Sequence, residues 1–151
     1  MTDMLRHTVA TLAYRGGKAL RGAPPEFANY PAGRTPAQIL AHLCDPFDWA
    51  LHIANGHEVW KTSTPQAWDA DVARFFAALE AFDRRLASGQ PLGVEPERLF
   101  QGPVADALTH VGQLAMLRRM AGCPISGENY FVAKIETGRV GPDQPAPVRE
   151  F

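Results

Sequence analysis

Apolar residues recur at steps of three and four along four segments of the chain, and this helical spacing restricts the fold more than any other feature. The segments cover residues 2–20, 36–54, 65–87 and 103–121. Stretches rich in Pro and Gly, such as GAPPEFANYPAG and SGQPLGVEPERLFQG, separate them. No run of β-branched residues alternates with polar residues as a half-buried strand requires. The sequence therefore predicts an all-α chain.

The ends of these segments carry helix signals of known types. Thr35 is a good N-cap, and Pro36 suits the first helical position because the missing N–H has no partner there. Gly122 suits the position after a helix C-terminus. Four amphipathic helices of similar length predict a four-helix bundle, and the longer connectors allow a topology other than simple up-and-down. After Cys123-Pro124 we expect an irregular tail, with a short helix around Asn129–Glu136 and an extended last dozen residues.

Length and composition bound the class of protein. With 151 residues, of which 46% are hydrophobic, the chain can form one domain over residues 1–151 with its own core. A formal net charge of -1 and the lack of any Lys- or Arg-rich run argue against nucleic-acid binding. The only cysteines, Cys44 and Cys123, lie far apart and predict neither a disulfide framework nor a CxxC zinc site.

Targeting signals are not apparent in the sequence. The N-terminal stretch carries Asp3, Arg6 and His7, so it lacks the apolar core of a signal peptide. No apolar run approaches the ~18 residues that a membrane span needs. We therefore expect a cytoplasmic protein that associates with neither membranes nor nucleic acids.

Three polar residues fall where a bundle core or its margin is expected. On a helical wheel His42 lies among apolar residues such as Ile39 and Leu43, so it should point inward. Asp106 and His110 are four residues apart and share one face of their helix. Such groups cost several kcal/mol inside a bundle unless they are paired or metal-bound. Spacing alone leaves two interpretations about equally good, which are a metal site and an Asp–His ion pair at a helix surface.

Two stretches resemble the DinB-like metal-binding superfamily, which includes YfiT-like and mycothiol-dependent maleylpyruvate isomerase-type proteins. TPAQILAHLCDPFDWAL resembles the second helix of that family, with its first histidine ligand at His42. DALTHVGQLAMLRRMAG resembles the helix with the last histidine, here His110, followed by Gly112-Gln113. The apolar stripe of residues 65–87 fits the same layout more weakly. Many members have a further histidine where this chain has Asp106, and some relatives use a carboxylate there.

The resemblance implies a four-helix bundle that holds one divalent metal, such as Zn, Ni, Fe or Mn, on His42, Asp106 and His110. It also implies metal-assisted transfer or hydrolysis of a small molecule, in several cases with a low-molecular-weight thiol as co-substrate. Two imidazoles and one carboxylate leave coordination positions open for water or substrate.

Three further residues are candidates for substrate binding. Trp49 lies close to His42 on the wheel, although a tryptophan there more often belongs to the core. Gln113 lies on the same stripe as His110. Arg118 borders the apolar arc of its helix, where it could hold an anionic substrate or be an ordinary surface arginine.

A non-enzymatic function is the alternative. The chain could form a homodimeric bundle with a stress-response or binding function. In that case the stripe of residues 65–87 would extend into a two-fold interface. This stripe consists of Trp68, Val72, Phe75, Leu79, Phe82 and Leu86.

Overall fold

Four long helical rods make up the structure, a computed structural model that describes residues 2–151. They are α1 (Thr2–Leu20), α2 (Pro36–Ala54), α3 (Trp68–Ala87) and a composite fourth rod. The fourth rod consists of α4 (Pro96–Leu99), a π-helical turn η2 (Phe100–Val104) and α5 (Ala105–Met120). Short 3-10 turns lie at η1 (Pro25–Asn29) and η3 (Tyr130–Val132). Residues 2–151 contain no strand, only an isolated bridge between Glu128 and Glu150, so the expected all-α four-helix bundle is confirmed.

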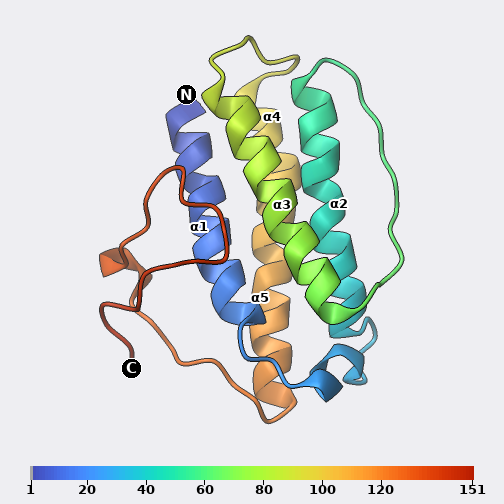
Figure 1. Cartoon of the computed structure of the whole chain (residues 1–151), viewed down its shortest axis with the longest axis vertical. Coiled ribbons are helices and arrows are strands. Elements are labelled where there is room, and N and C mark those ends of the chain that lie inside the picture. The colour runs from blue at the N-terminus through green and yellow to red at the C-terminus, as the bar shows by residue number, and fades with distance from the viewer. Residues whose placement is uncertain (1) are drawn as a thin grey trace.

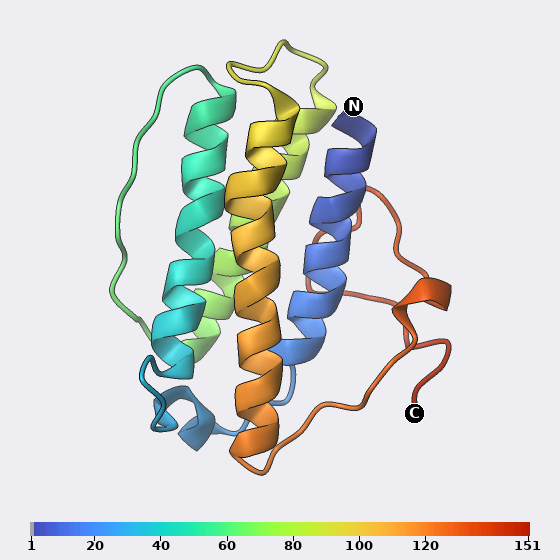
Figure 2. The ribbon, with the colours of Figure 1, turned by 180° about the vertical axis from the view of Figure 1, so that it is seen from behind.

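The four rods form a square in which α1 and α2 both pack against α3 and α5. In Figure 1, α1 and the fourth rod descend while α2 and α3 ascend. Because α2 and α3 are consecutive and parallel, the connection between them must return along the whole bundle. Residues 55–67, here called the strap, do so on the outside of α2 (Figures 1 and 2). One long crossover of this kind is a known variation on the up-and-down bundle.

The start of α2 follows the local sequence closely. The Thr35 hydroxyl accepts a hydrogen bond from the Gln38 amide at 3.3 Å, and the Gln38 side chain accepts one from the Thr35 amide at 2.9 Å. This reciprocal pair is a capping box, and Pro36 occupies the first helical turn as predicted. The cap fixes where α2 begins and therefore the turn on which His42 lies.

The fourth rod begins earlier than the sequence predicts. We expected a start near Pro103, since Gly102-Pro103 is typical of a helix N-terminus, but the helix already begins at Pro96. The π-helical turn resolves the conflict, because the amide of Ala105 donates to the carbonyl of Phe100, five residues earlier. The wider turn lets the rod continue past Pro103, which has no N–H to donate.

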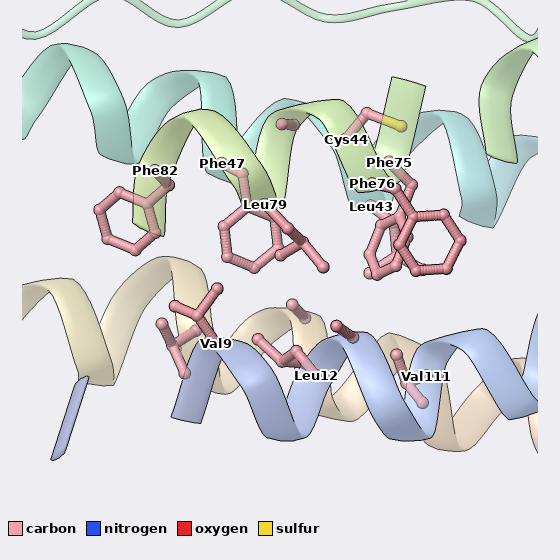
Figure 3. Packing of buried hydrophobic residues seen from close by; sticks show 14 of the residues in the cluster. Val9, Leu12, Leu43, Cys44, Phe47, Phe75, Phe76, Leu79, Phe82 and Val111 are labelled. Atoms are coloured by element: carbon pink, nitrogen blue, oxygen red, sulfur yellow. The ribbon is translucent and has the colours of Figure 1, made fainter. Parts of the chain in front are cut away.

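The core lies between the four rods, and Figure 3 shows Val9, Leu12 and Val111 opposite Phe47, Leu79 and Phe82. The stripe of residues 65–87 is used inside the chain: Phe75, Leu79, Phe82 and Leu86 are buried, and Trp68 and Val72 pack against the core. Only Trp68 and Val72 of the stripe are left partly exposed, and the homodimer stays a prediction. None of the helices in residues 2–151 is both long and apolar enough to cross a membrane.

The tail after α5 folds back along α1 (Figure 1). Glu128 is buried, accepts a hydrogen bond from the Tyr14 hydroxyl, and pairs with Lys18 at 2.7 Å. The amide of Phe151 donates to the carbonyl of Gly127 at 3.0 Å, so the extended C-terminal residues are held in place. The short helix expected over residues 129–136 is a single 3-10 turn at Tyr130–Val132.

Candidate metal centre

His42, Asp106 and His110 converge between α2 and α5. His42 Nε2 lies 3.1 Å from Asp106 Oδ2, and His110 Nε2 lies 3.4 Å from Asp106 Oδ1. The two imidazole rings have centroids 4.7 Å apart and are almost perpendicular. One ligand atom from each residue lies within 4.8 Å of the other two. Three residues predicted from two separate helices therefore form a single cluster.

The hydrogen bond of His110 to Gln113 determines which nitrogen of that ring faces the cluster. His110 Nδ1 lies 2.7 Å from Gln113 Oε1. An amide oxygen only accepts, so Nδ1 must carry the proton. Nε2 then faces the Asp106 carboxylate either as a lone pair or as part of an imidazolium. A bound cation satisfies a lone pair and a carboxylate at the same time, as in the second-shell arrangement of many metal sites.

The distances fit a small divalent ion. Zinc binds histidine nitrogen at about 2.0–2.1 Å, so neighbouring donors of a tetrahedral site lie about 3.3 Å apart. The separations of 3.1 and 3.4 Å are each close to that edge length and end on different oxygens of Asp106, and the three donor atoms as a set lie within 4.8 Å of one another. The two imidazoles approach different oxygens of Asp106, so both oxygens are within reach of an ion. The donor set thus fits a divalent metal with positions left open.

Exposure differs across the cluster. The His110 side chain is 11% exposed and that of Asp106 is 46% exposed. Asp106 borders a cavity of about 460 Å³ with walls formed by Pro46, Trp49, Trp60 and Pro103. We call it the near cavity. Because Asp106 is the most exposed of the three, a small molecule can reach the cluster from this side.

The strap forms part of the wall of the near cavity. Trp60 on the strap lies with its ring centroid 6.1 Å from that of His42 and 5.6 Å from that of Trp49. Asp45, three residues after His42 on α2, accepts hydrogen bonds from the Ser63 amide at 3.0 Å and the Ser63 hydroxyl at 2.7 Å. Arg74 on α3 donates to Asp45 at 2.9 Å, so α2, α3 and the strap are tied together.

Sequence reasoning did not find these strap contacts. The helical wheel places Asp45 on the polar face of its helix, yet Asp45 is 2% exposed because the strap lies over it. Burial alone would lower the pKa of Arg74, but hydrogen bonds to Asp45 and Asp48 outweigh it and raise that pKa. No local sequence pattern predicts that residues 55–67 return along α2. The contacts of Trp60 and Ser63 with α2 are therefore not predictable from the sequence.

The three candidate substrate residues have different outcomes. Trp49 lines the near cavity and donates from Nε1 to Glu58 at 3.2 Å. Gln113 contacts His110 and orients it, as described above. Arg118 is not near the cluster and is 5% exposed. Its guanidinium donates to three carbonyl groups, those of Ala19, Arg21 and Cys123, so it joins the C-terminal ends of α1 and α5.

Neither cysteine belongs to the centre. Cys44 is buried, and its thiol contacts the carbonyls of Leu40 and Asp71. Burial raises the pKa of the Cys44 thiol to about 12, so it stays protonated at neutral pH. Both cysteines are free thiols. The centre therefore has nitrogen and oxygen donors only.

Comparisons with protein-family models, with curated proteins and with solved structures find no match for this chain.

Proposed function

We propose that this protein is a metal-dependent transferase or hydrolase acting on a small molecule, with one divalent ion held by His42, Asp106 and His110. The convergence of these three side chains at one point carries the proposal. Membership of the DinB-like superfamily, inferred from the motifs around His42 and His110, is part of it. The proposal also includes a low-molecular-weight thiol as candidate co-substrate. It includes a cytoplasmic location as well, and the two free cysteines agree with that location.

Each residue around the ion has its own function in this proposal. Asp106 and the two imidazoles bind the ion, and Gln113 holds His110 in the tautomer that presents Nε2. Trp49 and Trp60 form aromatic walls beside Asp106, where they can orient a substrate and exclude water from one side. A divalent ion supplies the chemistry by lowering the pKa of a bound water or thiol, so that an anionic nucleophile exists near neutral pH.

Elemental analysis tests the proposal. The protein is purified without a histidine tag from cultures supplemented in turn with zinc, nickel, iron and manganese. We expect one equivalent of one metal in the wild type and a loss of it in His42→Ala and His110→Ala. His7→Ala is the matched control, because His7 is on the far side of α1 beside Thr137 and should leave the metal content unchanged.

Two results would contradict this function. One is a wild-type protein without metal under every supplement. The other is metal that survives in both alanine variants. With metal established, transfer of thiols to electrophilic substrates and hydrolysis of small esters and amides distinguish the two reaction classes, and the same alanine variants should abolish whichever is found.

A further inference from the structure

A second cavity, away from the metal cluster, shares part of its wall with the near cavity. This far cavity, of about 380 Å³, lies where the strap leaves α2 and is bordered by His57, Glu58 and Arg98. The two cavities share Trp49, Gln101, Gly102 and Pro103 as lining residues. The two neighbouring cavities, together called the groove, extend from Asp106 to Arg98 with Trp49 on their shared wall.

The π-helical turn forms the floor of this groove. Gln101, Gly102 and Pro103 belong to η2 (Phe100–Val104), and all three line both cavities. A Cβ on Gly102 would lie 3.8 Å from the Trp49 ring, an ordinary van der Waals distance, so the backbone of the turn lies close to the ring where the two cavities meet. Single π turns inside α-helices are frequent at functional sites. Here the turn separates Asp106 from Arg98 along one rod.

The far cavity presents opposite charges that do not pair with each other. No ion pair within 4.0 Å joins Arg98 to Glu58, or either of them to another residue, among residues 2–151. Glu58 accepts the Trp49 indole N–H with one oxygen at 3.2 Å, and its side chain is otherwise exposed. A ligand that carried only a carboxylate would meet repulsion from Glu58, and one that carried only an ammonium would meet repulsion from Arg98.

We propose that the groove binds an amino acid-like molecule whose α-ammonium and α-carboxylate lie between Glu58 and Arg98, and whose side chain passes Trp49 toward the metal cluster. Arg98 precedes Asp106 by eight positions, so the two lie about 12 Å apart along the rod at 1.5 Å per residue. An extended chain covers about 1.2 Å per bond, so a side chain of about six atoms covers about 7 Å, and the reach of the Arg98 side chain and of the metal–ligand bond covers the rest. One part of this inference rests on the proposed function, namely that the far end of the ligand's side chain reacts at the metal.

Fluorescence of the chelator-treated protein tests the charged end of the groove without a metal. Of the three tryptophans, Trp68 packs on Phe27 and lines neither cavity, so Trp68→Phe confines the signal to Trp49 and Trp60. The probes are 2-aminooctanoate, octanoate and heptylamine, which share an alkyl chain and differ in head-group charge. We expect 2-aminooctanoate to bind at least about fivefold more tightly than either single-charge probe.

Variants assign the two charges. Arg98→Gln should reduce the affinity for 2-aminooctanoate to that for heptylamine, and Glu58→Gln should reduce it to that for octanoate. Arg119→Gln and Glu80→Gln, exposed residues outside both cavities, should change nothing. Equal affinity for a single-charge probe, no saturable change with any probe, or a preference that survives both Arg98→Gln and Glu58→Gln would overturn the inference.

A second probe tests the connection to the metal. The ω-hydroxamate of 2-aminosuberate carries the same head group and a metal-binding group at the far end of its chain. Adding zinc should tighten its binding in the wild type and not in His110→Ala. If zinc has no effect while the head-group preference persists, the groove is a separate site and its link to the metal is wrong. If no zinc binds at all, the proposed function fails and the head-group result still stands alone.

Discussion

Gln113 controls His110 because an amide oxygen at Nδ1 leaves Nε2 free to bind a cation. Gln113→Leu removes that acceptor while Asp106 and both imidazoles remain. Loss of such a partner typically costs 10–100-fold in metal affinity. We therefore expect zinc affinity, measured by competition with a chelator, to fall by about that factor. The melting temperature of the chelated protein should stay close to that of the wild type, because Gln113 is exposed. An unchanged affinity would show that Gln113 does not orient the ring.

Cys44 gives a second prediction, concerning alkaline pH. Burial raises the pKa of its thiol from 9.0 to about 12, so the folded state holds this proton more tightly than the unfolded chain. That contribution to stability is complete below pH 9 and falls as the pH rises toward 12, by up to about 1.4 kcal/mol per pH unit.

The alanine variant isolates this contribution. Urea unfolding at pH 8 and pH 10 should show the wild type losing about 1 kcal/mol more than Cys44→Ala between these two values. Tyr14 and Lys18, whose pKa values are also raised in the folded protein, are present in both chains and cancel. Parallel losses in the two chains would mean that the thiol titrates alike in both states.

Residues differ in how well the sequence predicts their position. His42 and the Asp106–His110 pair were predictable because helical spacing alone decides which side chains share a face. Arg118 was not, since its three acceptors are carbonyl groups at the ends of α1 and α5, whose position depends on how the rods pack. Helical spacing predicts the stripe on which Gln113 lies, but its hydrogen bond to His110 depends on the rotamers of both side chains.

At the scale of elements, the connector between α3 and α4 approaches the end of α2 closely at Gly93. A Cβ on Gly93 would lie 2.5 Å from the Gly56 nitrogen and 2.8 Å from the Ile53 carbonyl oxygen, both of them backbone atoms that cannot move aside. We expect Gly93→Ala to destabilise the protein by about 1–3 kcal/mol in urea unfolding. It should also disturb the far cavity, which Gly93 lines.

Gly112 provides the matched control. It lies in the middle of α5, exposed, and a Cβ there would have no neighbour within 4 Å. Gly112→Ala should therefore raise stability by about 0.5–1 kcal/mol through its better helix propensity. Equal effects of the two substitutions would show that the contact at Gly93 is not tight.

The elements themselves were largely predictable. The bounds of α1 agree with its apolar spacing, and α2 begins at the cap that Thr35 and Pro36 indicate. The predicted start of the fourth rod was wrong. Gly102-Pro103 is a local signal for a helix start, but packing favours continuing the helix through a π turn. The path of the strap could not be predicted, since it depends on which two helices end up parallel.

At the scale of the whole molecule, a buried carboxylate helps to fix the tail to the bundle, as does Val140, which is buried in the core. Glu128 bonds to Tyr14 and Lys18, and its side chain is fully buried. Glu128→Gln keeps the shape but leaves the Lys18 ammonium less compensated, so we expect a loss of about 2–4 kcal/mol in urea unfolding. Glu150→Gln removes the other partner of Lys18, which is 44% exposed, and should cost less than about 1 kcal/mol. Similar losses would show that the tail is not anchored at Glu128.

The central claim is that α2 and α5 bring two imidazoles and one carboxylate to a single ion. Zinc-edge X-ray absorption on the protein loaded with one equivalent of zinc tests it most directly. The account predicts a first shell of nitrogen and oxygen at about 2.0–2.1 Å with outer-shell scattering from two imidazoles, reduced to one in His42→Ala. A sulfur ligand at about 2.3 Å, or a spectrum that His42→Ala and His110→Ala leave unchanged, would contradict it.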